Sequence, residues 1–164
     1  MFPPDLIARA TELVARYREA ALMTATAESC TGGLVAGLLT EIPGSSDMLE
    51  RGFVVYSNAA KQELLGVPAE TLVNHGAVSE RTAVAMAEGA LRASRAEVAV
   101  SVTGIAGPDG GSAEKPVGLV HFACARRGKA TVAREQRFGD LGRQGVRLAS
   151  VKVALDLLEA ALSR

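Results

Sequence analysis

The chain has 164 residues, 48% of them hydrophobic and 22% charged, with a formal net charge of zero, which predicts one domain with an ordinary hydrophobic core. The charge balance and the lack of a Lys/Arg run argue against nucleic-acid binding. Two cysteines are too few for a disulfide framework, and with no signal peptide and no apolar run of ~20 residues we expect a cytoplasmic protein without a membrane partner.

The first third of the chain alternates between helix and strand patterns. Apolar residues recur at helical spacing over residues 3–20, which predicts a first helix. Residues 22–27 then form a short apolar run typical of a buried strand. A second helix is predicted over residues 34–42, where a Pro-Gly pair stops it. Residues 48–56, rich in Phe and Val, predict a second strand.

The middle of the chain continues this alternation. Ser57 and Asn58 are suitable N-caps for a short helix that ends before Gly66. Ser79 begins a long Ala-rich helix. Residues 98–103 form an apolar strand that leads into the most glycine-dense loop of the chain.

The last third of the chain predicts a hairpin and a long helix. Residues 117–124 and 130–138 have the pattern of two strands joined by a turn at 127–129, and a final helix covers about residues 143–162. Strands that alternate with helices and then form a hairpin indicate an α/β fold, a three-layer α/β/α sandwich with a mixed, mostly parallel sheet. We expect residues 1–164 to form this single domain.

The first candidate site is the loop between the first strand and the second helix, residues 28–33. Backbone N–H groups at a helix start bind anions, and the two glycines that end this loop let the backbone approach a ligand closely. Ser29 therefore has the place of a nucleophile beside donors for an oxyanion, although the G-x-S-x-G elbow is absent. The alternative is a plain N-cap, in which Ser29 or Thr31 satisfies free amides.

A serine nucleophile needs a base, and neither histidine is well placed for that role. His75 precedes a glycine in a predicted turn, and His121 lies in the middle of a predicted strand. Serine hydrolases without a catalytic histidine use lysine, whose pKa falls when the amine is desolvated. Lys61 follows Asn58 by about one helical turn, so it could point back toward a strand end. The alternative is a solvated surface lysine.

Three further features of the sequence bear on its chemistry. Cys30 is a rival nucleophile, because a helix N-terminus lowers the pKa of a thiol; the alternative is a buried structural thiol. The glycine-dense loop 103–111 is a natural place for a ligand beside an α/β sheet, or else a plain connection, and it is neither a Walker A loop nor a dinucleotide fingerprint. With two separated histidines and no C-x-x-C motif, we expect no metal.

The chain contains several long motifs, which are T-A-E-S-C-T-G-G at 26–33, G-S-S at 44–46, R-G-F-V-V-Y-S-N at 51–58 followed by Lys61, H-G-A-V-S-E at 75–80, and V-T-G-I-A-G-P-D-G-G at 102–111 followed by K-P-V-G at 115–118. Together these motifs resemble the CinA C-terminal family. They arrive in the family's order, and the resemblance covers about residues 8–162.

This resemblance implies a three-layer α/β fold and a nicotinamide-nucleotide amidohydrolase, which hydrolyses nicotinamide mononucleotide to nicotinate mononucleotide and ammonia in bacterial pyridine-nucleotide recycling. The family's catalytic serine and lysine fall on Ser29 and Lys61. Its tyrosine falls on Tyr56, which we expect to relay a proton or to pack on the pyridine ring. The resemblance also implies a homodimer or higher homo-oligomer and a reaction that needs no metal or other cofactor.

The remaining candidates are residues expected to bind the nucleotide. An arginine fork suits phosphate oxygens, but the last helix departs from the family's G-D-R…V-R pattern, because Leu141 replaces the first arginine and the following spacing is longer. Arg143 and Arg147 therefore both remain candidates for the phosphate site. The predicted substrate-binding residues are Glu28, Thr31, Gly32, Gly33, Asn58, Thr103, Gly104, Gly107, Arg143 and Arg147.

The expected mechanism is attack by Ser29 Oγ on the carboxamide carbon, with neutral Lys61 taking the proton and amides near residues 31–33 stabilising the oxyanion. Two other functions would use the same residues. A non-catalytic nucleotide-binding or regulatory module, related to competence-damage proteins, would keep the pocket without turnover, and a hydrolase of another amide would keep the same pair. The enzyme prediction requires Ser29 and Lys61 to meet in a water-poor cleft.

Overall fold

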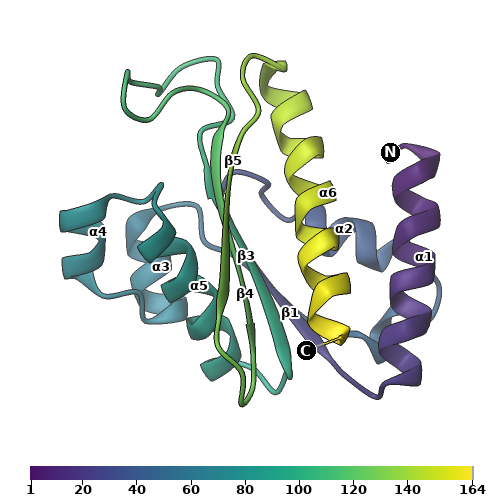
Figure 1. The fold of residues 1–164 in the computed structure, drawn as a ribbon. Helices are drawn as coiled ribbons and strands as arrows, with labels where there is room; N and C mark the ends of the chain where they lie inside the picture. The colour runs from purple at the N-terminus through teal and green to yellow at the C-terminus, as the bar shows by residue number, and fades with distance from the viewer. Residues whose placement is uncertain (164) are drawn as a thin grey trace.

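Five strands form one mixed sheet between two layers of helices in the computed structural model, which describes residues 1–163 (Figure 1). The strands are β1 (Thr24–Glu28), β2 (Leu49–Val54), β3 (Val98–Gly104), β4 (Leu119–Arg126) and β5 (Val132–Arg137). Their order across the sheet is β2-β1-β3-β4-β5. β1 pairs in parallel with β2 and β3, whereas β4 pairs antiparallel with β3 and β5.

Each face of the sheet carries three helices (Figure 1). On one face lie α1 (Pro4–Glu19), α2 (Leu34–Thr40) and α6 (Gly142–Leu162), and on the other lie α3 (Asn58–Leu65), α4 (Ala69–His75) and α5 (Glu80–Arg92). A short 3-10 turn, Ser45–Asp47, precedes β2. The main helix contacts with the sheet come from α6 on the first face and α5 on the second.

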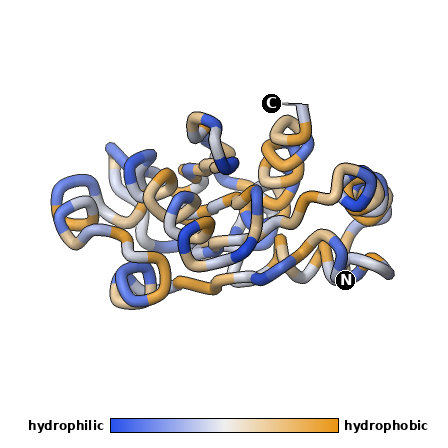
Figure 2. Tube along the Cα trace, turned by 90° about the horizontal axis from the view of Figure 1, so that it is seen from below, coloured by the Kyte–Doolittle hydropathy of each residue, from blue (hydrophilic) through white to orange (hydrophobic). Residues whose placement is uncertain are grey.

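The sheet separates two hydrophobic cores, because successive residues of a strand point to opposite faces. Val100 and Val102 of β3 belong to the core under α1, α2 and α6, while Ala99 belongs to the core under α5. Small residues dominate this second core and let its helices approach closely: a Cβ on Gly89 would collide with the carbonyl of Leu65. The helical turns carry both hydrophilic and hydrophobic residues, as helices with one buried face do (Figure 2).

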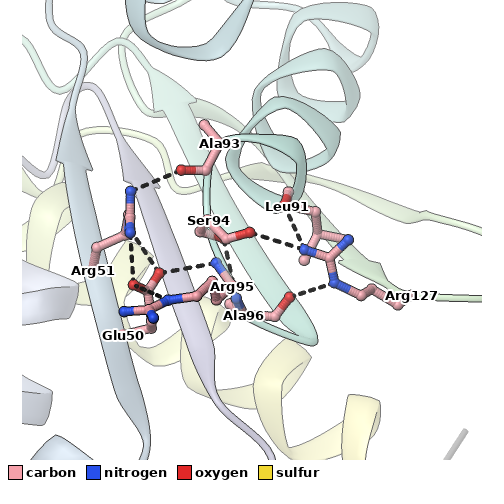
Figure 3. A network of polar contacts seen from close by, with 8 residues as sticks. All are labelled: Glu50, Arg51, Leu91, Ala93, Ser94, Arg95, Ala96 and Arg127. Carbon is pink, nitrogen blue, oxygen red and sulfur yellow. Dashed lines mark hydrogen bonds and ion pairs between the residues drawn. The ribbon is translucent and has the colours of Figure 1, made fainter.

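A network of polar contacts lies at the amino ends of the parallel strands, at the edge of the sheet opposite to their carboxyl ends (Figure 3). Arg127, after β4, donates hydrogen bonds of 2.7, 2.8 and 3.0 Å to three carbonyl oxygens within residues 91–96. From the other side, Arg51 donates to the Ala93 carbonyl at 2.9 Å and to the Glu50 carboxylate. The two arginines thus satisfy carbonyl groups at the end of α5, where no helical partner remains.

Replacing Arg127 with methionine is expected to lower the free energy of unfolding by about 1–2 kcal/mol, because three carbonyl oxygens lose their charged donor. Chemical denaturation with urea measures this change. The matched control is Arg92→Met, which changes the exposed last residue of α5 and should shift the urea midpoint of unfolding much less. Equal stability of both variants would show that the Arg127 contacts contribute nothing.

The predicted three-layer α/β/α sandwich is confirmed, as are the C-terminal hairpin and the long helix after it. The sheet is mixed as expected, but its four pairings are divided evenly between parallel and antiparallel rather than being mostly parallel. Helix α4 was not predicted, because its seven residues bury a single apolar side chain, Leu72. No helix within residues 1–163 is long and apolar enough to cross a membrane.

Candidate active site

The three parallel strands end at the same edge of the sheet, and candidate residues follow each of them. Ser29 follows β1, Tyr56 lies shortly after β2, and β3 ends at Gly104. In open α/β sheets, ligands bind at the carboxyl ends of the strands. A cavity of about 270 Å³ lies at this edge. The predicted residues that line it are Ser29, Tyr56, Lys61, Thr103, Gly104, Gly107 and Arg143.

Ser29 and Lys61 meet at the bottom of this cavity. The Lys61 Nζ lies 3.1 Å from the Ser29 Oγ, and the two residues are only 1% and 8% exposed. The start of α3 explains this placement: the Ser57 hydroxyl accepts the Ala60 N–H at 3.0 Å and caps the helix, so that Lys61 leaves the first turn toward the end of β1. The alternative of a solvated surface lysine is therefore wrong.

The surroundings of the Lys61 amine favour its neutral form. Burial lowers the pKa of Lys61 from its ordinary value of 10.5, and the nearby Cys30 opposes this shift. A neutral amine has two N–H bonds and one lone pair. The N–H bonds can donate to the carbonyls of Val55 and Tyr56, at 2.9 and 3.2 Å. The lone pair then faces the Ser29 hydroxyl, which is the arrangement a general base requires.

Glu28 lies outside the cavity, contrary to its prediction as a substrate-binding residue. Its carboxylate is 1% exposed and accepts three backbone N–H groups at the start of α2, from Gly33 at 3.1 Å, Val35 at 3.0 Å and Ala36 at 2.9 Å. The anion-binding position of this helix N-terminus is therefore filled by the protein's own carboxylate. A substrate anion has to bind elsewhere.

Two N–H groups of the turn after Ser29 are bound within the protein. Gly32 and Gly33 adopt positive φ angles of 58° and 96°, which glycine reaches without strain. The Gly32 N–H donates to the Ser29 carbonyl at 3.0 Å, and the Gly33 N–H donates to the adjacent carboxylate. Contrary to prediction, Thr31, Gly32 and Gly33 do not line the cavity. Among residues 1–163, the Cys30 N–H donates to no backbone carbonyl, and Cys30 does line the cavity, so its N–H is the donor left for an oxyanion.

The two candidate arginines lie one helical turn apart on α6 but serve different places. Arg143 lines the cavity, donates to the Gly107 carbonyl at 2.8 Å and lies 3.3 Å from the Tyr56 hydroxyl. Tyr56 itself is 63% exposed at the cavity mouth. Arg147 does not line this cavity and donates to the carbonyls of Cys30 and Thr31, at 3.1 and 3.0 Å. Both arginines also line a second cavity of about 380 Å³ beside Phe2, but only Arg143 is placed to meet a ligand in the cavity that contains Ser29.

The loop after β3 forms the opposite wall of the cavity. Thr103 donates its hydroxyl hydrogen to the Ala77 carbonyl at 2.7 Å, which ties this wall to the segment before α5. Gly104 has no room for a side chain, since a Cβ there would lie 2.7 Å from Val120 and 2.8 Å from the Leu119 carbonyl. Asn58 is exposed and is the first residue of α3. Its side chain is not part of the lining.

Three alternatives from the sequence lose support. Burial raises the pKa of Cys30 to about 12, so its thiol stays protonated and is a poor nucleophile. His75 ends α4, and His121 is buried on β4 with its Nε2 3.8 Å from Glu135; neither lines the cavity. Residues 1–163 contain no group of three or more His, Cys, Asp or Glu side chains that could hold a metal ion.

Several cavity residues were not among the predicted site residues. Ala77 and Val78, before α5, line the cavity, and Ile105, Ala106, Asp109 and Gly110 extend the wall after β3. The H-G-A-V-S-E and G-I-A-G-P-D-G-G segments contain all of these positions. The motifs therefore indicated that these segments matter. Apolar and glycine residues in a motif do not indicate on their own which of them contact a ligand.

Comparison with known proteins gives a consistent relationship. Residues 7–162 match the CinA C-terminal domain family. The nicotinamide-nucleotide amidohydrolase PncC of Escherichia coli K12 is 58% identical over 134 residues, 81% of this chain and 80% of that protein. A CinA-like protein of Anaeromyxobacter dehalogenans is 54% identical over 97% of this chain, which spans 37% of that longer protein.

Solved structures agree with this relationship. The competence/damage inducible protein CihA of Agrobacterium tumefaciens superposes with a TM-score of 0.96 at 55% sequence identity, covering 100% of this chain and 99% of that one. A CinA superfamily protein of Klebsiella pneumoniae superposes with a TM-score of 0.91 at 33% identity, covering 96% and 98% of the two chains. The present chain is a member of the CinA C-terminal domain family.

Proposed function

We propose that this protein hydrolyses the carboxamide of nicotinamide mononucleotide to nicotinate mononucleotide and ammonia, with Ser29 as nucleophile and Lys61 as general base. The relative named as a nicotinamide-nucleotide amidohydrolase supports the substrate, since it is 58% identical over four fifths of each chain. The observation that carries the chemistry is the buried contact of 3.1 Å between Lys61 Nζ and Ser29 Oγ. Amide hydrolysis needs such an activated hydroxyl.

The proposed reaction has two stages. Ser29 Oγ attacks the carboxamide carbon while its proton passes to the neutral Lys61 amine, and the carbonyl oxygen becomes an oxyanion that the Cys30 N–H stabilises. The Lys61 ammonium then gives this proton to the leaving nitrogen, so that ammonia departs and an acyl-serine remains. In the second stage Lys61 takes a proton from water, hydroxide attacks the acyl carbon, and return of the proton frees Ser29 and nicotinate mononucleotide.

The shape of the cavity supports one orientation of the nucleotide. With the carboxamide against Ser29, the ribose phosphate extends toward the mouth, where Arg143 and Tyr56 lie. No carboxylate pairs with Arg143 among residues 1–163, so its guanidinium keeps donors for phosphate oxygens. The helix N-terminus beside the nucleophile does not compete for this phosphate, because Glu28 already fills it.

The direct test is release of ammonia from nicotinamide mononucleotide by the purified protein. A coupled ammonia assay measures this rate, and Ser29→Ala is the control for a contaminating amidase. A panel that includes nicotinamide, the unphosphorylated riboside and glutamine separates this substrate from other amides. Binding of the nucleotide without release of ammonia would instead support a non-catalytic nucleotide-binding module.

The rate is expected to depend on pH through Lys61. Burial lowers the pKa of this amine, and the base acts only when deprotonated, so kcat/KM should rise with pH up to that lowered pKa and then level off. Below it, each pH unit should lower the rate about tenfold, because the neutral fraction falls by that factor. A profile that stays flat down to about pH 4 would contradict a lysine base.

A further inference from the structure

Two charged side chains bind the backbone of the turn 29–33, which we call the nucleophile loop. Glu28 precedes the loop, and its carboxylate reaches the N–H groups of Gly33, Val35 and Ala36 beyond it. The carboxylate therefore closes the loop into a ring, from the last residue of β1 to the first turn of α2. Because the residue is 1% exposed, water does not compete for these hydrogen bonds.

The second charged side chain that contacts the loop comes from α6. Arg147 of α6 donates from Nε to the Cys30 carbonyl at 3.1 Å and from one terminal nitrogen to the Thr31 carbonyl at 3.0 Å. The same guanidinium lies 3.5 Å from the place a Cβ of Gly32 would occupy. A third contact, from the Ser29 N–H to the Val102 carbonyl at 2.9 Å, fixes the loop to β3.

These contacts pair four polar groups of the loop backbone, namely the N–H groups of Ser29 and Gly33 and the carbonyls of Cys30 and Thr31. The Glu28 carboxylate accepts from N–H groups, and the Arg147 guanidinium donates to carbonyl oxygens, so each ionised group binds backbone atoms of the opposite partial charge. Hydrogen bonds to ionised groups are stronger than those between neutral groups. No ion pair links Glu28 or Arg147 to another side chain among residues 1–163. Both charges therefore act on the backbone alone.

We propose that Glu28 and Arg147 are positioning residues, which hold the nucleophile loop so that the Ser29 hydroxyl stays against Lys61. This inference rests on the proposed function in that Ser29 is taken as the nucleophile. It separates the two arginines of α6 by role: Arg143 meets the substrate, whereas Arg147 acts through the loop.

Kinetics of two lysine variants distinguish these roles. Arg147→Lys keeps the charge but loses the fork that binds two carbonyls, and a displaced nucleophile costs about 10²-fold in rate. We expect kcat to fall by about that factor while KM stays close to the wild-type value, equally for nicotinamide mononucleotide and for the unphosphorylated riboside. Arg143→Lys should instead raise KM for the mononucleotide and weaken inhibition by inorganic phosphate. A raised KM and weaker phosphate inhibition in Arg147→Lys would overturn the proposal.

A second measurement tests the inference independently of the substrate. A small fluorophosphonate forms a bond to Ser29 Oγ with loss of fluoride, so its rate of labelling, followed by mass spectrometry, reports the placement and activation of the hydroxyl. Glu28→Gln and Arg147→Lys should both label at least about tenfold more slowly, whereas Glu41→Gln, at the exposed end of α2, should label at the wild-type rate.

The outcomes of this labelling separate the two proposals. Slow labelling of both variants supports positioning even if the wild-type protein releases no ammonia from nicotinamide mononucleotide. Wild-type rates in the folded variants would overturn positioning, and a wild-type protein that does not label at all would overturn it as well. Circular dichroism establishes folding; if Glu28→Gln does not fold, Arg147→Lys, which leaves the α2 contacts intact, decides the result.

Discussion

Ser29→Ala is expected to reduce ammonia release from nicotinamide mononucleotide by roughly 10⁴- to 10⁶-fold, the range seen when a serine hydrolase loses its nucleophile. The physical reason is that no other group can take its place: Cys30 lines the same cavity, but burial raises the pKa of its thiol to about 12. The rate of ammonia formation under saturating substrate measures the loss.

The control for this variant is Ser46→Ala, which changes an exposed serine in the short turn before β2 and should leave the rate unchanged. The Ser29→Ala protein should still bind the nucleotide, because the rest of the cavity remains, and calorimetric titration measures that affinity. Ammonia release at the wild-type rate would remove Ser29 from the reaction.

Lys61→Met is expected to lower kcat by roughly 10²- to 10⁴-fold, the usual contribution of a general base. Methionine fills a similar volume without an amine, so the Ser29 hydroxyl loses the group 3.1 Å away that would accept its proton. The residual rate should no longer show the acidic fall that the lysine imposes on the wild-type pH profile. Lys61→Arg is the informative companion, because it restores a cation but supplies no base near neutral pH, and it should not recover activity.

The same substitution has a consequence for stability that does not depend on catalysis. The folded-state pKa of Lys61 is lowered from 10.5 by burial, so between that lowered pKa and 10.5 the unfolded chain binds more protons than the folded one. Stability therefore increases with pH across this window. The Lys61→Met protein should lack this part of the pH dependence, which thermal unfolding at several pH values measures. An identical slope in both proteins would mean that the amine is ordinarily solvated.

The layers of the fold were predictable because they depend on local patterns. Apolar runs such as 98–103 become buried strands, and α5 begins directly after Ser79, whose hydroxyl accepts the Thr82 N–H at 3.1 Å as an N-cap should. Pairing direction was less predictable. The long connections between the first three strands allow parallel pairing. The loop over residues 105–118 instead returns β4 antiparallel to β3, and the hairpin pairs β5 antiparallel with β4, so that the two kinds of pairing are equal in number.

The candidate site was predictable in its residues but not in its geometry. Ser29 and Lys61 are 32 positions apart, and no local pattern states that a lysine on a short helix is buried beside a strand end. A motif also does not show where a side chain points. Glu28 belongs to the same motif as the nucleophile, yet its carboxylate accepts backbone N–H groups of α2. The expected homo-oligomer and cytoplasmic location stay predictions.

One helix reaches both the mouth of the cavity and the backbone around the nucleophile, through Arg143 and Arg147. A tilt of α6 would therefore disturb affinity and turnover together, since both arginines move with the same rigid body. Engineering that aims at a bulkier amide should leave this helix in place and reshape the wall at residues 105–110, which line the cavity from the loop after β3.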